Sequence, residues 1–226
     1  MSPESQSDFF KRLSQVKSLL KDGCKLVIVS KNRTVEEIKS YYELGQRDFG
    51  ENKVQELQDK SFKLLESCPE IRWHMIGHLQ SNKINQLFSI PKLWAIHSVD
   101  SAELLIKMIQ AESRLSSNIN IFLQLKTSQE VEKYGFESLE DLDLAIFELK
   151  KSQRLNFFGL MTMGVVRTDH FEQEARRCFR ELNEMKNILS DKLKMSLNSS
   201  MGMSQDYLIA LEESSNWIRL GTMMFE

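Results

Sequence analysis

A lysine follows an apolar run near the start of the chain. The segment KLVIVS, residues 25–30, has the composition of a buried strand, and Lys31 comes directly after it. An amine at that place either pairs with a carboxylate such as Glu51 or acts as a nucleophile. In a partly desolvated, cation-rich pocket the amine loses its proton more readily, and the neutral amine condenses with an aldehyde to a Schiff base.

Two glycine-bearing segments further along have the residue types of a phosphate site. They are SSMGMSQD and RLGT, which supply Ser199, Ser200, Gly202, Ser204, Gly221 and Thr222. Backbone N–H groups at a helix start lack partners and favour an anion, and glycine allows a ligand to approach the backbone closely. The segments therefore predict a phosphate cradle. The alternative is that Ser204 only caps a helix and Gly202 only forms a turn.

Arg219 helps to choose among ligands that carry both an aldehyde and a phosphate. Phosphosugars and pyridoxal 5′-phosphate (PLP) both fit that description. Arg219 lies two residues before Gly221, so on a strand the two point to the same side. A guanidinium there can meet a pyridine nitrogen, keep it unprotonated and weaken the cofactor as an electron sink. A structural ion pair is the alternative role for Arg219.

Short apolar segments alternate with longer amphipathic ones along the whole chain, as in repeated βα units. The segments predicted as strands are residues 25–30, 47–50, 72–77, 93–98, 119–125, 156–163, 194–198 and 216–222. Helices are predicted over about 7–21 and over 34–45, 52–67, 81–89, 102–115, 138–152, 170–192 and 204–214. Eight such units in 226 residues predict a single (β/α)8 TIM-type barrel over residues 1–226, with residues 1–24 as a helical extension. An open doubly wound sheet is the alternative. In a barrel the site lies at the C-terminal ends of the strands.

Composition favours a small ligand over a macromolecule. The chain has 30 basic and 32 acidic residues spread along its length, so neither nucleic acid nor a membrane surface is an expected partner. A polar N-terminus and the lack of a long apolar stretch predict a cytoplasmic protein, and a monomer is expected. His74 and His78 have the spacing of a helical metal pair, but Gly77 and strand-like neighbours argue against a helix, so no metal site is predicted.

Seven segments together resemble the PLP homeostasis protein family, also called the proline synthase co-transcribed homologue family. They are VSKNRTVEEI, GQRDFGENKVQEL, IRWHMIGHLQSNK, HSVDS, FFGLMTM, SMGMSQD and IRLGT, which span about Leu26 to Phe225. Members are single-domain barrels similar to the N-terminal domain of alanine racemase, and they bind PLP. By this resemblance Lys31 would hold PLP as an internal aldimine, and Arg219 would face the pyridine nitrogen. The other cofactor-binding residues it implies are Asn52, Ser200, Met203, Ser204, Gly221 and Thr222, with His78 at the pocket rim.

The resemblance implies a non-catalytic role in PLP (vitamin B6) homeostasis. The protein would hold PLP and pass it on, with PLP-requiring apo-enzymes as candidate acceptors. A PLP-dependent amino-acid racemase is the alternative, and its second acid/base would be Tyr134 or His78. A Schiff-base aldolase acting on a phosphosugar, with Lys31 as nucleophile, is a third possibility.

Two places depart from the family pattern. Asn32, Arg33 and Thr34 stand where the family usually has a Thr-Lys-Pro-like run, which alters the rim and leaves the role of Lys31 intact. Ser199 stands where leucine is more usual, just before the matching Ser200.

Overall fold

In the residues that the computed structural model describes, 3–21, 23–128, 134–164 and 169–226, eight parallel strands close into a barrel. The strands are β1 (Lys25–Val29), β2 (Asp48–Glu51), β3 (Arg72–Met75), β4 (Leu93–Val99), β5 (Ile119–Gln124), β6 (Leu155–Met161), β7 (Asn198–Ser200) and β8 (Trp217–Leu220). They pair in chain order, and β8 pairs with β1. The predicted (β/α)8 barrel is confirmed, and the open-sheet alternative is wrong.

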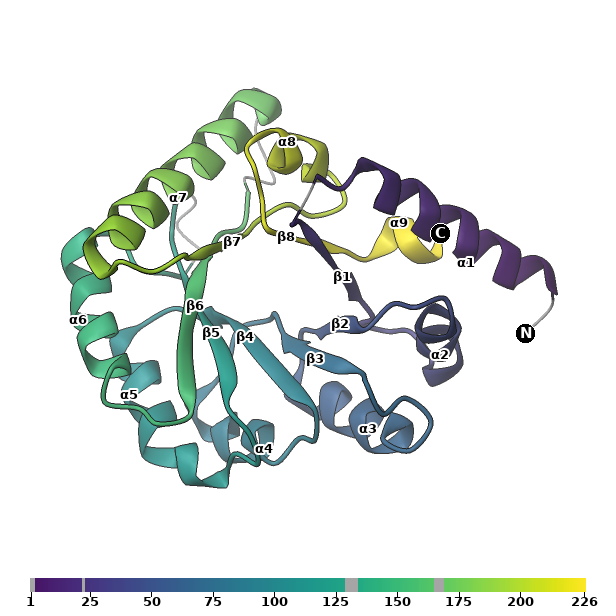
Figure 1. Cartoon of the computed structure of the whole chain (residues 1–226), viewed down its shortest axis with the longest axis horizontal. Coiled ribbons are helices and arrows are strands. Elements are labelled where there is room, and N and C mark those ends of the chain that lie inside the picture. The colour runs from purple at the N-terminus through teal and green to yellow at the C-terminus, as the bar shows by residue number, and fades with distance from the viewer. Residues whose placement is uncertain (1–2, 22, 129–133, 165–168) are drawn as a thin grey trace.

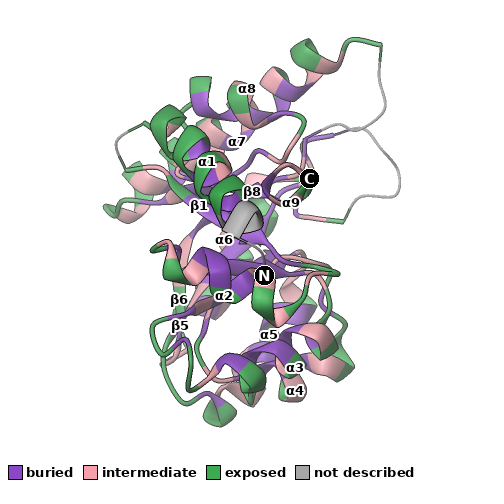
Figure 2. Cartoon of the chain, turned by 90° about the vertical axis from the view of Figure 1, so that its right-hand side faces the viewer, coloured by how far each residue is buried: buried purple, intermediate pink, exposed green. Residues whose placement is uncertain are grey.

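Helices surround the ring of strands (Figure 1). They are α1 (Pro3–Leu19), α2 (Val35–Glu43), α3 (Val54–Leu64), α4 (Ile84–Phe88), α5 (Ala102–Ala111), α6 (Leu139–Leu149), α7 (Phe171–Leu193), α8 (Tyr207–Glu212) and α9 (Thr222–Phe225), with 3-10 turns η1 (Ser81–Lys83) and η2 (Glu112–Arg114). Helix α1 lies beside α9, and Phe9 of α1 packs on Tyr41 and Phe225. The strands are buried, whereas the outer faces of the helices are exposed (Figure 2).

Hydroxyl side chains set the starts of several helices. The Thr34 hydroxyl accepts a hydrogen bond from the Glu37 N–H, and the Glu37 carboxylate accepts one from the Thr34 N–H. This reciprocal pair is a capping box, and it fixes the start of α2 at Val35, four residues after Lys31. Ser101 and Ser138 cap α5 and α6 in the same way through one hydrogen bond each.

Two apolar layers hold the barrel together. The larger lies between the strands and the helices, and it includes Ile28, Phe49 and Leu105. The smaller fills the barrel interior with Val27, Ala95, Phe122, Met161 and Trp217. Side chains alternate between these layers along each strand, because successive residues of a strand point to opposite faces. Polar residues at inward positions therefore become buried inside the barrel.

Two of the boundaries that differ from the prediction concern predicted site residues. Strand β7 covers Asn198–Ser200 and not residues 194–198, because Lys194 adopts a left-handed conformation (φ 54°) that ends α7. Ser199 and Ser200 therefore lie in the strand and not in the loop after it. Thr222 begins the short helix α9, which the sequence prediction missed, and so is not part of β8.

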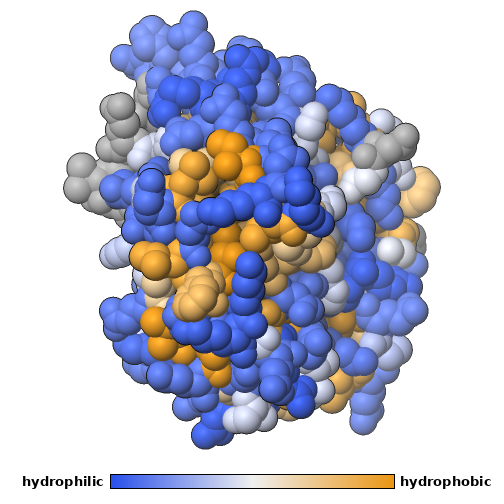
Figure 3. All heavy atoms as spheres, turned by 60° about the vertical axis from the view of Figure 1, so that its left-hand side comes forward, coloured by the Kyte–Doolittle hydropathy of each residue, from blue (hydrophilic) through white to orange (hydrophobic). Residues whose placement is uncertain are grey.

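The outer surface is mixed. Figure 3 shows apolar side chains among hydrophilic ones on one side of the molecule. Exposed large apolar side chains of the outer helices include Ile106 on α5, Leu144 and Phe147 on α6 and Ile188 on α7. Over the described parts of the chain, no helix is both long enough and apolar enough to cross a membrane.

Candidate functional site

A cavity of about 390 Å3 opens at the C-terminal ends of the strands. This volume lies in the range of about 300–1,000 Å3 that is usual for small-ligand sites. Seven of the predicted site residues line it: Lys31, Asn52, Met203, Ser204, Arg219, Gly221 and Thr222. Apolar side chains such as Val29, Ile76, Met163 and Phe171 form much of the remaining wall. These apolar residues were not predicted from the sequence.

The other predicted residues lie outside the cavity lining, and they are Ser199, Ser200, Gly202, His78 and Tyr134. Ser200 is fully buried in β7, where its Oγ accepts a hydrogen bond of 2.6 Å from Arg219 Nη1. His78 Nδ1 lies 2.9 Å from Asp100 Oδ2, and the His78 ring stacks on Tyr134 at 4.7 Å. The described residues include no group of three His, Cys, Asp or Glu side chains placed to hold a metal ion.

Lys31 is exposed at the mouth of the cavity. The predicted alternative, an ion pair with Glu51, is wrong, because Glu51 Oε1 accepts hydrogen bonds from Lys60 Nζ (2.8 Å) and Ser30 Oγ (2.7 Å) instead. The partial desolvation expected of Lys31 is not found either. Among the described carboxylates none forms an ion pair with Lys31, so its amine is available to a ligand.

The loop that carries Lys31 is held from both sides. Lys60 Nζ donates to the Ser30 carbonyl at 2.7 Å, which fixes the end of β1. Asn32 adopts a left-handed conformation (φ 59°), which an asparagine tolerates better than most residues. Arg33 forms a 2.7 Å ion pair with Glu226. These contacts fix the conformation of the loop after β1, which includes Asn32 and Arg33, two of the residues that depart from the family pattern.

Asn52 offers an unused acceptor in the cavity wall. Its Oδ1 is buried and has no hydrogen-bond partner among the described residues. Gly77 lies against the backbone of Asn52, and only glycine allows this close approach, because a Cβ at residue 77 would lie 2.2 Å from the Asn52 carbonyl oxygen. Unpaired buried acceptors are uncommon in folded proteins. A hydrogen-bond donor on a ligand would satisfy this one.

The two glycine-bearing segments meet at the cavity. The Gly221 N–H donates to Ser204 Oγ at 3.4 Å, which joins the turn after β7 to the turn after β8. Gly202 has φ 98°, and a Cβ at that position would lie 2.6 Å from the Ala210 Cβ, so only glycine fits. Buried Asp206, which the sequence analysis missed, accepts a 2.6 Å hydrogen bond from the Met203 N–H and shapes the turn.

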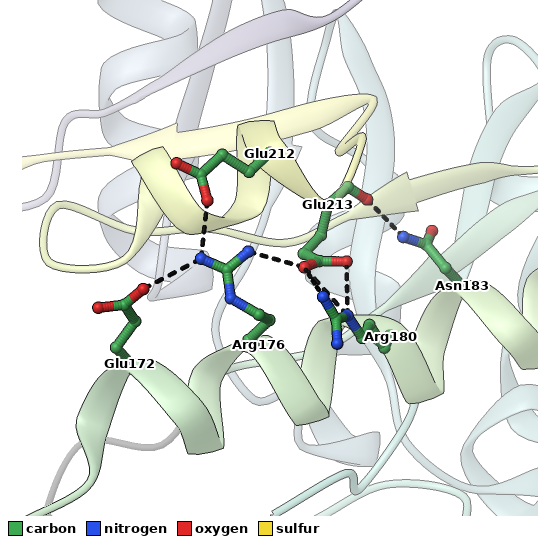
Figure 4. A network of polar contacts seen from close by, with 6 residues as sticks. All are labelled: Glu172, Arg176, Arg180, Asn183, Glu212 and Glu213. Atoms are coloured by element: carbon green, nitrogen blue, oxygen red, sulfur yellow. Dashed lines mark hydrogen bonds and ion pairs between the residues drawn. The ribbon is translucent and has the colours of Figure 1, made fainter.

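An ion-pair network fastens α8 to α7 behind this turn (Figure 4). Arg176 contacts Glu212 at 2.7 Å and Glu213 at 2.8 Å, and Arg180 contacts Glu213 at 3.1 Å. Asn183 Nδ2 donates to the Glu213 carbonyl oxygen. Burial alone would raise the pKa of Glu213, but hydrogen bonds from Arg180 and Arg176 bring it below its usual value. The network therefore holds the helix that follows the cavity turn.

Arg219 lines the cavity but is otherwise buried, with 4% of its surface exposed. Nη1 donates to Ser200 Oγ at 2.6 Å, and Nη2 donates to the Thr162 carbonyl oxygen at 3.0 Å. Burial lowers the pKa of Arg219 to about 10, so the guanidinium stays charged at neutral pH. Both hydrogen-bond partners of Arg219 among the described residues are uncharged, so the predicted structural ion pair is not found there.

A buried polar line continues from Ser200 across the barrel interior. His97 Nδ1 lies 2.8 Å from Ser200 Oγ, and His97 Nε2 lies 2.9 Å from His74 Nδ1. His74 Nε2 lies 3.0 Å from Asp48 Oδ1. Burial lowers the pKa of both histidines. This line was not predicted from the sequence, although its polar residues at inward strand positions were an available signal.

The two buried histidines make the fold sensitive to mild acid. Their pKa values lie below the usual 6.5, so the unfolded chain binds protons where the folded chain does not. The neutral histidines therefore contribute stability that is fully present above pH 6.5 and is lost as the pH falls towards their lowered pKa values. We expect the free energy of unfolding to drop by up to ~2.7 kcal/mol per pH unit below about pH 6.5. Urea unfolding across this range measures it, and a free energy that stays level to about pH 5 would contradict it.

Sequence comparison places the chain among known proteins. A sequence model of the family described as "Alanine racemase, N-terminal domain" matches residues 6–226. The pyridoxal phosphate homeostasis protein of Caenorhabditis elegans is 36% identical over 208 residues, which cover 89% of this chain and 85% of that protein. The protein of the same name from Helicobacter pylori is 38% identical over 202 residues, which cover 89% and 87%. The chain belongs to this homeostasis protein family. The resemblance seen in the sequence is confirmed.

Solved structures agree on the fold. PipY of Synechococcus elongatus PCC7942 without PLP has a TM-score of 0.88 at 32% identity, covering 96% of this chain and 100% of that chain. Its structure with PLP bound gives 0.84 at 31% identity with the same coverage. Alanine racemase from E. faecalis, at 14% identity, has a TM-score of 0.73 and covers 97% of this chain and 58% of that one. This last likeness shows the fold alone.

Proposed function

We propose that this chain binds PLP and serves PLP homeostasis by holding the cofactor and passing it on. The observation that carries the proposal is that Lys31, Arg219 and both glycine-bearing segments line one cavity. An amine, a cationic donor, and hydroxyl and backbone groups of the two turns match the aldehyde, ring nitrogen and phosphate of PLP. Relatives named for PLP homeostasis and PipY with PLP bound support the same ligand.

Each functional group of PLP has a matching residue in the cavity lining. Lys31 would attach the aldehyde carbon, and Arg219 would face the ring nitrogen. Ser204, Gly221 and Thr222 would hold the phosphate, since Thr222 begins a helix and its N–H has no partner within that helix. Two further lining residues, Asn52 and Met203, complete the proposed contacts. Ser200 would act on the cofactor only through Arg219, because it does not line the cavity.

PLP supplies an aldehyde, which condenses with an amine to a C=N bond and releases water. Beside the ring nitrogen, a charged guanidinium disfavours a proton on that atom, because like charges repel. An unprotonated ring withdraws electrons less strongly. This chemistry suits a protein that stores PLP better than one that breaks bonds at an amino-acid α-carbon.

Non-catalytic action is part of the proposal. The racemase alternative needs a second acid/base at the ligand, and its two candidates, His78 and Tyr134, contact each other outside the cavity lining. We expect the PLP-loaded chain to exchange the α-hydrogen of amino acids in deuterated water no faster than free PLP does. A rate well above that of free PLP would favour the racemase instead.

Titration of the ligand-free chain with PLP tests the binding and transfer. We expect saturation at one PLP per chain, an absorption change typical of a C=N bond, and activation of an added PLP-requiring apo-enzyme by the loaded chain. Binding no stronger than that of an unrelated lysine-rich protein would contradict the proposal. Monomeric state and cytoplasmic location stay predictions from the sequence.

A further inference from the structure

A line of buried polar side chains crosses the barrel interior beneath the cavity. It consists of Asp48, His74, His97, Ser200 and Arg219, all with 5% or less of their surface exposed. Hydrogen bonds of 3.0, 2.9, 2.8 and 2.6 Å join them in this order. The line starts at the first residue of β2 and ends one residue before the end of β8. Attachment of PLP to Lys31 does not by itself require it.

With both histidines neutral, one placement of hydrogens satisfies every bond in the line. Arg219 can only donate, so Ser200 Oγ accepts from it and directs its own O–H to His97 Nδ1. His97 then carries its proton on Nε2 and donates to His74 Nδ1. His74 likewise carries its proton on Nε2 and donates to Asp48. Every hydrogen bond thus points from the cation towards the anion.

We propose that Asp48, His74, His97 and Ser200 are positioning residues that hold the Arg219 guanidinium charged and aimed at the ring nitrogen of bound PLP. The inference rests on the proposed function. Each neutral link turns its negative end towards Arg219 and its positive end towards Asp48, so the line stabilises both charges at once. Aligned hydrogen bonds of this kind strengthen one another in a low-dielectric interior.

Charged side chains face the ends of the line. Arg72 Nη2 donates to Asp48 Oδ2 at 2.6 Å. The charges of Arg72 and Lys25 act on His74, and the carboxylate of Asp206 favours the charged form of Arg219. Aromatic rings pack on the two histidines, and these rings are Trp94, Trp217 and Phe122. Their apolar surroundings agree with the lowered pKa of both histidines.

The far end of the line offers a discriminating substitution. In Asp48→Asn the amide oxygen would accept from Arg72, which leaves the NH2 group facing His74 Nε2. That group can only donate, so both histidines must move their protons to Nδ1. Ser200 Oγ would then accept from both His97 and Arg219, and its own O–H would lose its acceptor. A structural filler would show no such directed change.

Nitrogen NMR of the histidines in the ligand-free full chain tests the direction. We expect His74 and His97 to be neutral with the proton on Nε2 at neutral pH, and to move it to Nδ1 in Asp48→Asn. Asp100→Asn, which alters the separate pair with His78, is the matched control and should leave both tautomers unchanged. A proton on Nδ1 of either histidine in the unsubstituted chain would overturn the inference. Should Asp48→Asn not fold, this last result and the Ser200 variants decide it.

A second measurement follows the cofactor. With nitrogen-labelled PLP bound, the apparent pKa of the ring nitrogen should rise by about one unit, tenfold in proton affinity, in Ser200→Ala. Ser200→Thr keeps a hydroxyl and should restore the original value. Bound PLP with an unchanged ring-nitrogen pKa in Ser200→Ala would overturn the inference and leave the proposed function standing. Failure of PLP to bind at all would overturn the proposed function, while the histidine tautomers would still report on the line.

Discussion

Replacing Lys31 with alanine is expected to abolish covalent attachment of PLP and to weaken its binding about a hundredfold, or ~2.7 kcal/mol. The amine is the only group that the proposal assigns to the aldehyde, whereas Arg219 and the glycine-bearing segments would still hold the ring and phosphate without it. Equilibrium dialysis measures the affinity, and the absorption spectrum shows whether the C=N bond forms.

The matched control for this variant is Lys39→Ala. Lys39 is also exposed, but it lies on α2 outside the cavity lining. It should bind PLP as the unsubstituted chain does, because surface lysines that lack the phosphate and ring contacts react only weakly. An equal loss in both variants would mean that PLP binds lysines without selection.

Replacing Lys60 with methionine is expected to destabilise the fold by about 3–5 kcal/mol. Lys60 Nζ contacts Glu51 Oε1 at 2.8 Å, and Glu51 has no exposed surface. Burial already raises the pKa of Glu51, and hydrogen bonds from Lys60 and Ser30 only partly offset this. Without Lys60 the carboxylate must either stay charged in an apolar site or take up a proton. Urea unfolding of the ligand-free chain measures the loss.

The pH dependence and a second substitution separate this cause from lost packing. A raised pKa gives stability that is present below the unfolded value, about 4.3, and lost as pH rises. The loss in Lys60→Met should therefore grow between about pH 4 and pH 8. Adding Glu51→Gln removes the buried charge and should recover more than half of the loss at neutral pH. A loss that is independent of pH, with no recovery in the double variant, would contradict the account.

The buried pair of Lys60 and Glu51 also lies next to the loop that carries Lys31. Lys60 also holds the Ser30 carbonyl, the last backbone acceptor before Lys31. Weaker PLP binding in Lys60→Met, at a urea concentration where the chain is still folded, would show that the buried pair aims the loop as well as stabilising the barrel.

The barrel could be predicted because each βα unit has a recognisable pattern of apolar and polar residues. Apolar runs mark strands such as Leu93–Val99, and amphipathic segments mark helices such as Phe171–Leu193. Strand β7 escaped because two of its three residues are the buried serines Ser199 and Ser200, which carry no apolar signal. Their burial is set by partners on other strands, and a single sequence does not state those partners.

Some residues of the site could be predicted from the sequence and others could not. Lys31, Asn52, Ser204 and Thr222 could be predicted because each stands at the end of a strand or in the turn after one, where a barrel places its site. The line beneath them could not, because it depends on which inward positions of five different strands meet. His97 illustrates this, since it is a single polar residue in an apolar strand until Ser200 and His74 are placed beside it.

Borohydride reduction of the PLP-loaded chain, followed by peptide mass mapping, tests whether Lys31 holds the cofactor. Reduction turns a C=N bond into a stable C–N bond and so marks the lysine that held the aldehyde. We expect one phosphopyridoxyl group per chain, on the peptide that contains Lys31. A modification spread over several lysines, or concentrated on a lysine outside the cavity, would contradict it.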